Sequence, residues 1–354
     1  MQYPCILINL KKIKHNVKTI ISLCKLKNIQ VVGVIKVFCA RRPIVNAYIE
    51  GGINTIGDSR IENIKRLKDY HCKKILLRIP MESDVYDIVK YCDISLNSEL
   101  DTIKKLSNAA MKMNKVHSII LMVDVGDLRE GVLVEDVIST VKEINKLHNI
   151  KLLGIGTNLT CYGGVLPDEN NLGKLVSLKN EIQRMFNQKL SIISGGNSSS
   201  LYMVLNGTIP EGINQLRIGE GIVLGRETAF GKPIPDCFND AFLLRGEIVE
   251  IKNKPTVPTG KIGVDAFGET PEYVDKGIRK RAIIALGRQD INIDGIFPVD
   301  KNINIFGGSS DHLIIDITDC SCDYKIGDII DFTMDYGCLL KAMTSPYVKK
   351  YYVN

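Results

Sequence analysis

Lys36 stands where a side-chain amine can do chemistry. It directly follows the apolar run 31–35, whose length and composition are typical of a buried strand. In a barrel of parallel strands, reactive groups gather at the C-terminal strand ends, so a lysine there projects into the mouth. Such an amine can act as a nucleophile and carry protons. A single lysine after a strand is more often an ordinary surface residue, so the argument depends on the other strand ends.

Polar side chains follow other predicted strands in the same way. Arg129 lies just after one strand, Asn158 follows the next, and Arg217 lies in the last. The Gly/Ser-rich segment 194–200 contains Ser198 and offers backbone amides and hydroxyl groups, which suit a phosphate. Each feature alone is weak, since Gly, Asn and Ser are also common in turns. Together and in this order, they indicate one shared site.

The spacing of apolar residues predicts the elements that position these side chains. Residues 11–27 carry an apolar helical stripe that includes Ile13, Val17 and Ile20. Eight short apolar segments are typical of strands, at residues 31–35, 54–57, 74–79, 92–96, 118–124, 152–157, 190–194 and 215–219. Eight strands with helical patterns between most of them predict an α/β fold, a TIM (β/α)8 barrel over residues 11–225.

The pattern changes towards the C-terminus. Segments 241–251, 281–286 and 313–317 are typical of strands, and Gly, Pro and Asp turns separate them. Because helical spacing is largely absent, residues 226–354 are predicted to form a C-terminal all-β domain. The N-terminal strand, within residues 1–10, precedes the first helix and is compatible with either domain; we group it with the second.

Composition and charge exclude several classes of protein. The 354 residues suffice for two domains, and 45% apolar with 24% charged residues is typical of a globular protein. A formal net charge of +6 with no basic block argues against nucleic-acid binding. No apolar run is long enough to span a bilayer, so no membrane partner is expected. The first residues lack the order of a signal peptide, and we expect a cytoplasmic protein.

The cysteines do not form a recognisable framework. The ten are irregularly spaced, and most lie in apolar contexts where cysteine acts as a small core residue. Free thiols suit a reducing compartment. Cys320 and Cys322 form a C-x-C pair without further ligands at suitable spacing, so no metal site is expected.

The strings 8–10 and 34–36, with the polar strand ends, resemble the alanine racemase family of fold-type III enzymes, which use pyridoxal 5′-phosphate. The resemblance covers essentially the whole chain. It implies that Lys36 holds this cofactor as a Schiff base and moves protons at the α-carbon of a small-molecule amino-acid substrate. It also implies a homodimer with shared active sites, because residues 307–311 align with a segment that enters the partner subunit's active site.

The resemblance carries two cofactor-binding arginines to this sequence. Arg129 falls on the arginine that faces the phenolic oxygen of the cofactor, and Arg217 on the one that contacts the pyridine nitrogen. An arginine holds its proton too tightly to pass it to that nitrogen. The ring is then a weaker electron sink, which disfavours side reactions such as transamination.

Other matched residues concern the cofactor phosphate. Ser198 matches the serine of a phosphate-binding Asn-Ser pair, and Tyr336 matches the tyrosine that completes this site. Gly219 and Glu220 would offer backbone amides to the same phosphate. The resemblance therefore implies a phosphate site made from the last two barrel strand ends and one residue of the β-domain.

Longer strings suggest the substrate. Residues 36–40, 124–131 and 196–201 look most like the ornithine racemase subgroup. This similarity predicts a racemase of a basic amino acid, with ornithine foremost. Ala40 stands where the family has a bulky tyrosine and would leave room for a longer substrate, while Asp311 matches a position that meets the distal amine in related decarboxylases.

The sequence departs from the family at two further functional positions. Asn158 replaces the histidine that packs near the cofactor ring, and Arg288 replaces the partner-subunit tyrosine that serves as the second base. Arginine is a poor proton acceptor, so another second base is needed. The candidates are Asp311, His312 and Asp290, although a solvated strand histidine is the simpler interpretation of His312. Arg288, Asp290 and Asp311 are also the predicted substrate-binding residues.

Other functions remain open on the sequence. A related basic amino-acid decarboxylase would usually have a cysteine in place of Ser310 and a glutamate in place of Arg217. A non-catalytic carrier of the cofactor would leave residues 226–354 without a role. An alanine or broad-specificity racemase is a further alternative, and an aldolase would usually need a metal site.

Overall fold

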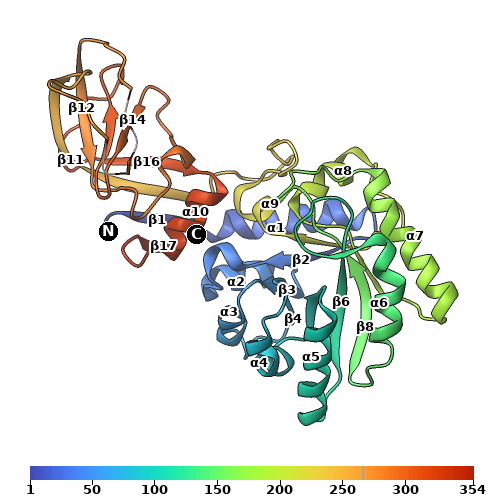
Figure 1. Cartoon of the computed structure of the whole chain (residues 1–354). Coiled ribbons are helices and arrows are strands. Elements are labelled where there is room, and N and C mark those ends of the chain that lie inside the picture. The colour runs from blue at the N-terminus through green and yellow to red at the C-terminus, as the bar shows by residue number, and fades with distance from the viewer. Residues whose placement is uncertain (265–266, 269, 271) are drawn as a thin grey trace. The chain divides into compact units, whose positions relative to one another are not determined.

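The computed structural model describes residues 1–264, 267–268, 270 and 272–354. The chain divides into two compact units, one of residues Leu10–Asn239 and one of Met1–Asn9 with Asp240–Asn354 (Figure 1). The division falls after residue 239 and not after residue 225 as expected from the sequence. The intervening segment belongs to the first unit because Asn16 in α1 (Leu10–Lys25) donates to Phe238 O at 2.8 Å and accepts from Phe238 N at 2.8 Å.

The first unit, all of which the structure describes, is a closed barrel of eight parallel strands. These are β2 (Gln30–Val34), β3 (Thr55–Asp58), β4 (Lys73–Leu76), β5 (Ile94–Asn97), β6 (His117–Asp124), β8 (Ile150–Gly156), β9 (Ile192–Ser194) and β10 (Gln215–Ile218). The barrel closes because β10 pairs with β2 and β5 pairs with β6. Each strand overlaps a predicted segment, so the TIM-barrel prediction is confirmed. A short strand, β7 (Val132–Leu133), pairs in parallel with the end of β6.

Helices surround these strands in the first unit (Figure 1). After α1 they are α2 (Arg42–Gly51), α3 (Ile61–Arg66), α4 (Val85–Tyr91), α5 (Leu100–Lys112), α6 (Val137–Ile144), α7 (Glu169–Phe186), α8 (Leu201–Asn206) and α9 (Glu220–Leu224). In α1, the predicted apolar face is buried at Ile13, Val17 and Ile20. The amphipathic spacing of the sequence therefore determines how this helix packs on the barrel.

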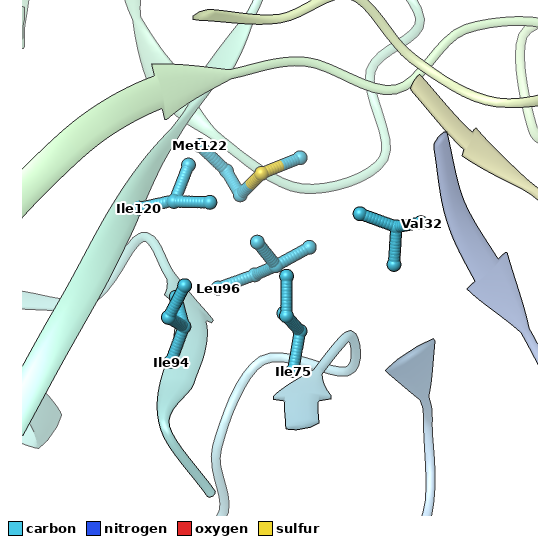
Figure 2. Close-up of a cluster of buried hydrophobic side chains, with 6 residues drawn as sticks. All are labelled: Val32, Ile75, Ile94, Leu96, Ile120 and Met122. Atoms are coloured by element: carbon cyan, nitrogen blue, oxygen red, sulfur yellow. The ribbon is translucent and has the colours of Figure 1, made fainter. Parts of the chain in front are cut away.

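Apolar side chains from several strands fill the barrel interior. Figure 2 shows a buried cluster in which they point towards one another: Val32, Ile75, Ile94, Leu96, Ile120 and Met122. Burying each such side chain contributes roughly 1.5–3 kcal/mol. Because this interior is packed with apolar groups, the polar side chains at the strand ends are confined to the mouth.

The second unit contains the β-domain predicted from the sequence. Its strands are β1 (Cys5–Asn9), β11 (Phe242–Pro255), β12 (Ile278–Ile284), β13 (Ile296–Pro298), β14 (Asn304–Gly308), β15 (Leu313–Asp316), β16 (Ile329–Met334) and β17 (Lys349–Val353). They pair antiparallel except for β1 with β17. One helix, α10 (Tyr336–Thr344), was not predicted and is capped by Asp335, whose side chain accepts from Cys338 N at 2.7 Å. No helix among the described residues of the chain is long and apolar enough to cross a membrane.

Candidate active site

Lys36 lies at the end of β2, as the sequence predicts. Ile35 N donates to Gly57 O at 2.9 Å, so the strand stays paired up to the residue before the lysine. Lys36 then begins a single 3-10 turn, and Cys39 and Ala40 follow with φ of 53° and 51°. Such left-handed conformations are uncommon for residues with a side chain and cost about 1–3 kcal/mol each. The chain therefore turns sharply after the lysine and leaves its amine at the mouth.

The Lys36 side chain is exposed to solvent, but nearby protein atoms partly desolvate its amine. This desolvation lowers the pKa of Lys36, and the nearby charge of Arg129 lowers it further. The charges of Cys161, Asp58 and Glu130 oppose the shift without cancelling it. A lowered pKa means that a larger fraction of the amine is neutral near pH 7, and the neutral amine is the nucleophilic form.

Arg217 is a deeply buried charge at the mouth, with 4% of its surface exposed. Its Nη1 donates to Ser194 Oγ, and its Nη2 donates to Thr157 O at 2.6 Å. Burial lowers the pKa of Arg217 to about 10, and the charge of Arg129 contributes in the same direction. The guanidinium is still charged at neutral pH, and two strand ends fix its plane.

Asn158 can contact either arginine, depending on the orientation of its amide. Arg217 Nη2 lies 3.5 Å from Asn158 Oδ1, which also accepts from Asn197 Nδ2 at 3.0 Å. Turning the Asn158 amide by half a turn brings its oxygen to 3.0 Å from Arg129 Nη2. Arg129 also pairs with the adjacent Glu130. The structure thus brings three predicted residues, Arg129, Asn158 and Arg217, into one polar network.

Ser198 and the start of α9 form a second cluster. Ser198 Oγ accepts from Gly221 N at 3.1 Å, which brings the serine-rich turn beside Gly219 and Glu220. Ser199 Oγ is buried and has no hydrogen-bond partner among the described residues. Hydroxyl groups and backbone amides that converge in this way suit an anion such as a phosphate. The predicted phosphate-site residues of the first unit therefore lie together.

Asp58 is a residue of this region that the sequence analysis missed. It is the last residue of β3, is fully buried, and accepts from Arg60 N at 2.8 Å and Asn63 Nδ2 at 3.1 Å. Burial raises the pKa of Asp58 to about 6. Its charge acts on Lys36 from the neighbouring strand. The signal in the sequence was an aspartate directly after the predicted strand 54–57.

The predicted residues of the β-domain also gather, within the second unit. Arg288 N donates to Ser309 O at 2.9 Å and Gln289 N donates to Ser310 O at 3.0 Å, so the two predicted segments adjoin. The Arg288 guanidinium lies 4.8 Å from the ring centroid of Phe267. Tyr336 begins α10, and Lys341 in the same helix donates to Arg288 O.

The candidate acidic groups of the β-domain have different environments. Asp290 is 8% exposed and its Oδ1 accepts from Ser345 Oγ at 2.6 Å, an arrangement that favours a structural role. Asp311 and His312 are exposed. Asp311 Oδ2 accepts from the adjacent Ser310 Oγ at 2.6 Å. Of the three candidates for a second base, Asp311 and His312 are the accessible ones.

The first unit is therefore a TIM barrel whose mouth carries a nucleophilic amine, two arginines and a hydroxyl-lined cluster, as in enzymes that act on anionic ligands. Residues 8–227 match the family model described as the N-terminal domain of alanine racemase. The chain is 52% identical to the ornithine racemase of Acetoanaerobium sticklandii, over 98% of this chain and 99% of that protein. It is 44% identical to the lysine racemase of Thermotoga maritima, over 99% of each. The chain belongs to the alanine racemase family and is an amino-acid racemase by class.

Solved structures agree on the fold. An alanine racemase of Clostridium difficile 630 has a TM-score of 0.74 at 18% identity, and the match covers 100% of this chain and 96% of that protein's chain. A D-threonine aldolase from Filomicrobium marinum has a TM-score of 0.73 at 13% identity, over 97% of this chain and 88% of its own. At such low identity these likenesses support the barrel and β-domain and nothing about the substrate.

Proposed function

We propose that this chain interconverts the L- and D-forms of ornithine, using pyridoxal 5′-phosphate held on Lys36. The observation that carries the proposal is the barrel mouth, where the charge of Arg129 acts both on a lysine amine of lowered pKa and on the buried Arg217. The near full-length identity of 52% to an ornithine racemase supports the choice of substrate.

The residues of the mouth fit this cofactor. It is an anion, and the positive charge of Arg129 acts on both Lys36 and Arg217, lowering the pKa of each. Ser198 and the unpartnered Ser199 hydroxyl lie in the cluster that suits its phosphate. The chemistry that the cofactor supplies when bound is an electron sink for the pair left on an α-carbon after its proton leaves.

The side chains divide the work between binding and proton transfer. Arg217 donates hydrogen bonds and keeps its own proton, because its pKa stays far above neutral pH. Arg129 and Asn158 lie on the opposite side of the mouth, and the Asn158 oxygen can accept from Arg217 in one orientation of the amide or from Arg129 in the other. Lys36 takes a proton from the α-carbon, or returns one to it, on the face that its amine reaches.

Substrate recognition is assigned to the β-domain. Asp311 is exposed and negatively charged, so it can meet the distal ammonium group of ornithine. Arg288 N donates to Ser309 O, which places the Arg288 segment beside the segment of Asp311. The Arg288 guanidinium can then meet the substrate carboxylate. Tyr336 at the start of α10 is proposed to complete the phosphate site. His312 and Asp311 remain candidates for a proton carrier from this domain.

We also propose a homodimer in which the β-domain of one subunit completes the barrel site of its partner. Two-fold pairing is the commonest assembly. Mixing Lys36→Ala protein with Asp311→Ala protein should restore activity through composite sites that carry both intact residues. Full activity from a monomer in solution would contradict this proposal. The cysteines are free thiols, which supports a cytoplasmic location.

A chiral chromatographic assay over the common amino acids tests the function. Purified protein with the cofactor should convert L-ornithine and D-ornithine to the same mixture, faster than it converts lysine or alanine. A higher rate with lysine would favour the activity named for the Thermotoga maritima relative. Release of carbon dioxide, or no formation of the opposite enantiomer from any amino acid, would contradict racemisation.

A further inference from the structure

The barrel mouth holds one more reactive side chain, the thiol of Cys161, for which the proposed function gives no role. Cys161 lies in the loop after β8 and is exposed. Asn158 Nδ2 donates to Cys161 Sγ at 2.8 Å, and Asn197 Nδ2 lies 3.6 Å from the same sulfur. The amide that contacts the arginines therefore also contacts the thiol.

The loop holds Cys161 in a defined place. The buried carboxylate of Asp127 accepts from Tyr162 N at 3.1 Å and from Val165 N at 3.2 Å. Thr160 has a φ of 54°, and its N donates to Val165 O at 2.9 Å. A left-handed residue with a side chain persists only where surrounding contacts impose it. The backbone on both sides of Cys161 is thus fixed by hydrogen bonds.

Cys161 and Lys36 interact across the mouth. Negative charge on the Cys161 sulfur raises the pKa of Lys36 and so opposes the effect of burial. In the barrel, β9 and β10 separate β8 from β2, so the two side chains enter the mouth from different sides. An acid–base pair placed in this way can reach opposite faces of one bound molecule.

Racemisation needs a proton carrier on each face of the α-carbon, and Arg288 is a poor acceptor for the second. We propose that Cys161 is this second carrier and works opposite Lys36 in the reaction proposed above. The thiolate sulfur takes the α-hydrogen as a proton, the electron pair of the broken C–H bond stays with the α-carbon, and the Lys36 ammonium group gives a proton to the other face. In the reverse direction the Lys36 amine accepts and the Cys161 thiol donates, so no oxidant or reductant is needed.

Asn158 can serve both forms of the thiol. With its Nδ2 towards Cys161 it donates to the sulfur, as a thiolate requires. With the amide turned, its oxygen faces the sulfur and also accepts from Arg129 Nη2 at 3.0 Å, as a protonated thiol requires. The asparagine that departs from the family histidine therefore fits a thiol in this position.

Two matched variants test the proposal, because Cys161 and Cys322 are both exposed thiols. With the cofactor bound, Cys161→Ser should racemise ornithine about 100-fold more slowly, or worse, in both directions, while Cys322→Ser matches the wild type. In heavy water, Cys161→Ser should still exchange the α-hydrogen of one enantiomer, the one that Lys36 serves, and lose exchange of the other. Wild-type protein should exchange both.

A second readout uses cofactor-free protein. Competitive acetylation followed by mass spectrometry should give a lower pKa for Lys36 in Cys161→Ser than in wild type, because the opposing charge has gone. An unchanged Lys36 pKa, or racemisation within threefold of wild type, would overturn the proposal. If Cys161→Ser still bound the cofactor but lost α-hydrogen exchange of both enantiomers equally, the proposal would also be overturned. The same holds if Asp311→Ala lost the exchange of one enantiomer and Cys161→Ser did not. Wild-type protein that racemises nothing would instead refute the proposed function, and this inference with it.

Discussion

The barrel mouth and the polar end of the β-domain hold their functional groups in different ways. At the mouth, Arg217 is almost completely buried and both of its terminal nitrogens donate to strand-end groups. In the β-domain, Asp311 and His312 are exposed, and Asp311 accepts a hydrogen bond from its neighbour Ser310. The mouth is preorganised by buried contacts, whereas the β-domain groups are available to an incoming molecule.

This difference matches the two tasks assigned to these regions. A resident cofactor is bound once and must be held in a fixed geometry, which buried and fully hydrogen-bonded side chains provide. A substrate enters and leaves in every cycle, so its contacts must be reachable. We expect substitutions at the mouth to abolish function and substitutions in the β-domain to change substrate preference.

The largest effect is expected for Lys36→Ala. The variant lacks both the amine that holds the cofactor and one proton carrier, so racemisation should fall by about 10⁴-fold or more. Borohydride should no longer fix the cofactor on the protein, as mass spectrometry would show. Lys65→Ala is the control, because Lys65 is paired with Asp87 on α4, away from the strand ends. Fixation that persists in Lys36→Ala would refute the assignment of this lysine.

The sequence predicted the barrel well because its strands are short, mostly buried and largely apolar. Such strands can be recognised from the local sequence alone, without knowledge of what they pack against. The N-terminal strand also lies in the predicted unit, since β1 pairs with β11 and β17. Helix α10 was missed because it is nine residues long and lies among strands, where local spacing is a weak signal.

The candidate site was predictable only in part. Lys36, Arg129 and Arg217 follow or lie in predicted strands, and resemblance to a family assigned their roles. Asp58 and Cys161 were missed for a physical reason. What makes these two residues notable is their contact with residues far away in the sequence. The pairing of β3 with β2 brings Asp58 near Lys36, and the amide of Asn197 lies beside the Cys161 sulfur.

A substitution in the β-domain should act on substrate binding. Asp311→Asn removes a charge-assisted contact to the distal amine, typically worth roughly 1.5–3 kcal/mol, so the KM for ornithine should rise about 10- to 100-fold. Cofactor affinity should stay unchanged, because Asp311 has no place in the mouth network. Asp294→Asn is a control at another exposed aspartate of the same domain. An unaltered preference for ornithine over alanine would show that Asp311 is not the selector.

Asp58→Asn should change the pH dependence of stability. Burial raises the pKa of Asp58 from 3.8 to about 6, so its contribution to folding is fully present below pH 4 and is lost as pH rises through 6. The variant carries no charge at this position at any pH. Its free energy of unfolding relative to wild type should therefore rise between pH 4 and pH 7, by roughly 1–3 kcal/mol. Thermal unfolding at several pH values measures this, and a relative stability that is constant with pH would contradict a buried carboxyl of raised pKa.

The smallest effect is expected for Asp290→Asn, and it separates the two aspartates of the β-domain. Asp290 Oδ1 accepts from Ser345 Oγ at 2.6 Å, and asparagine can keep that contact through its amide oxygen. Loss of the charge should weaken the bond and lower the free energy of unfolding by about 0.5–1.5 kcal/mol, with the KM for ornithine unchanged. Ser345→Ala should cost more, because Ser345 Oγ also accepts from Tyr347 N and Val348 N, and Asp290→Asn added to it should cost little further, because the bond that it weakens is already gone. A raised KM for ornithine in Asp290→Asn would instead show that Asp290 contributes to substrate binding, as the sequence suggested. The contrast between a buried structural aspartate and an exposed functional one would then be weaker.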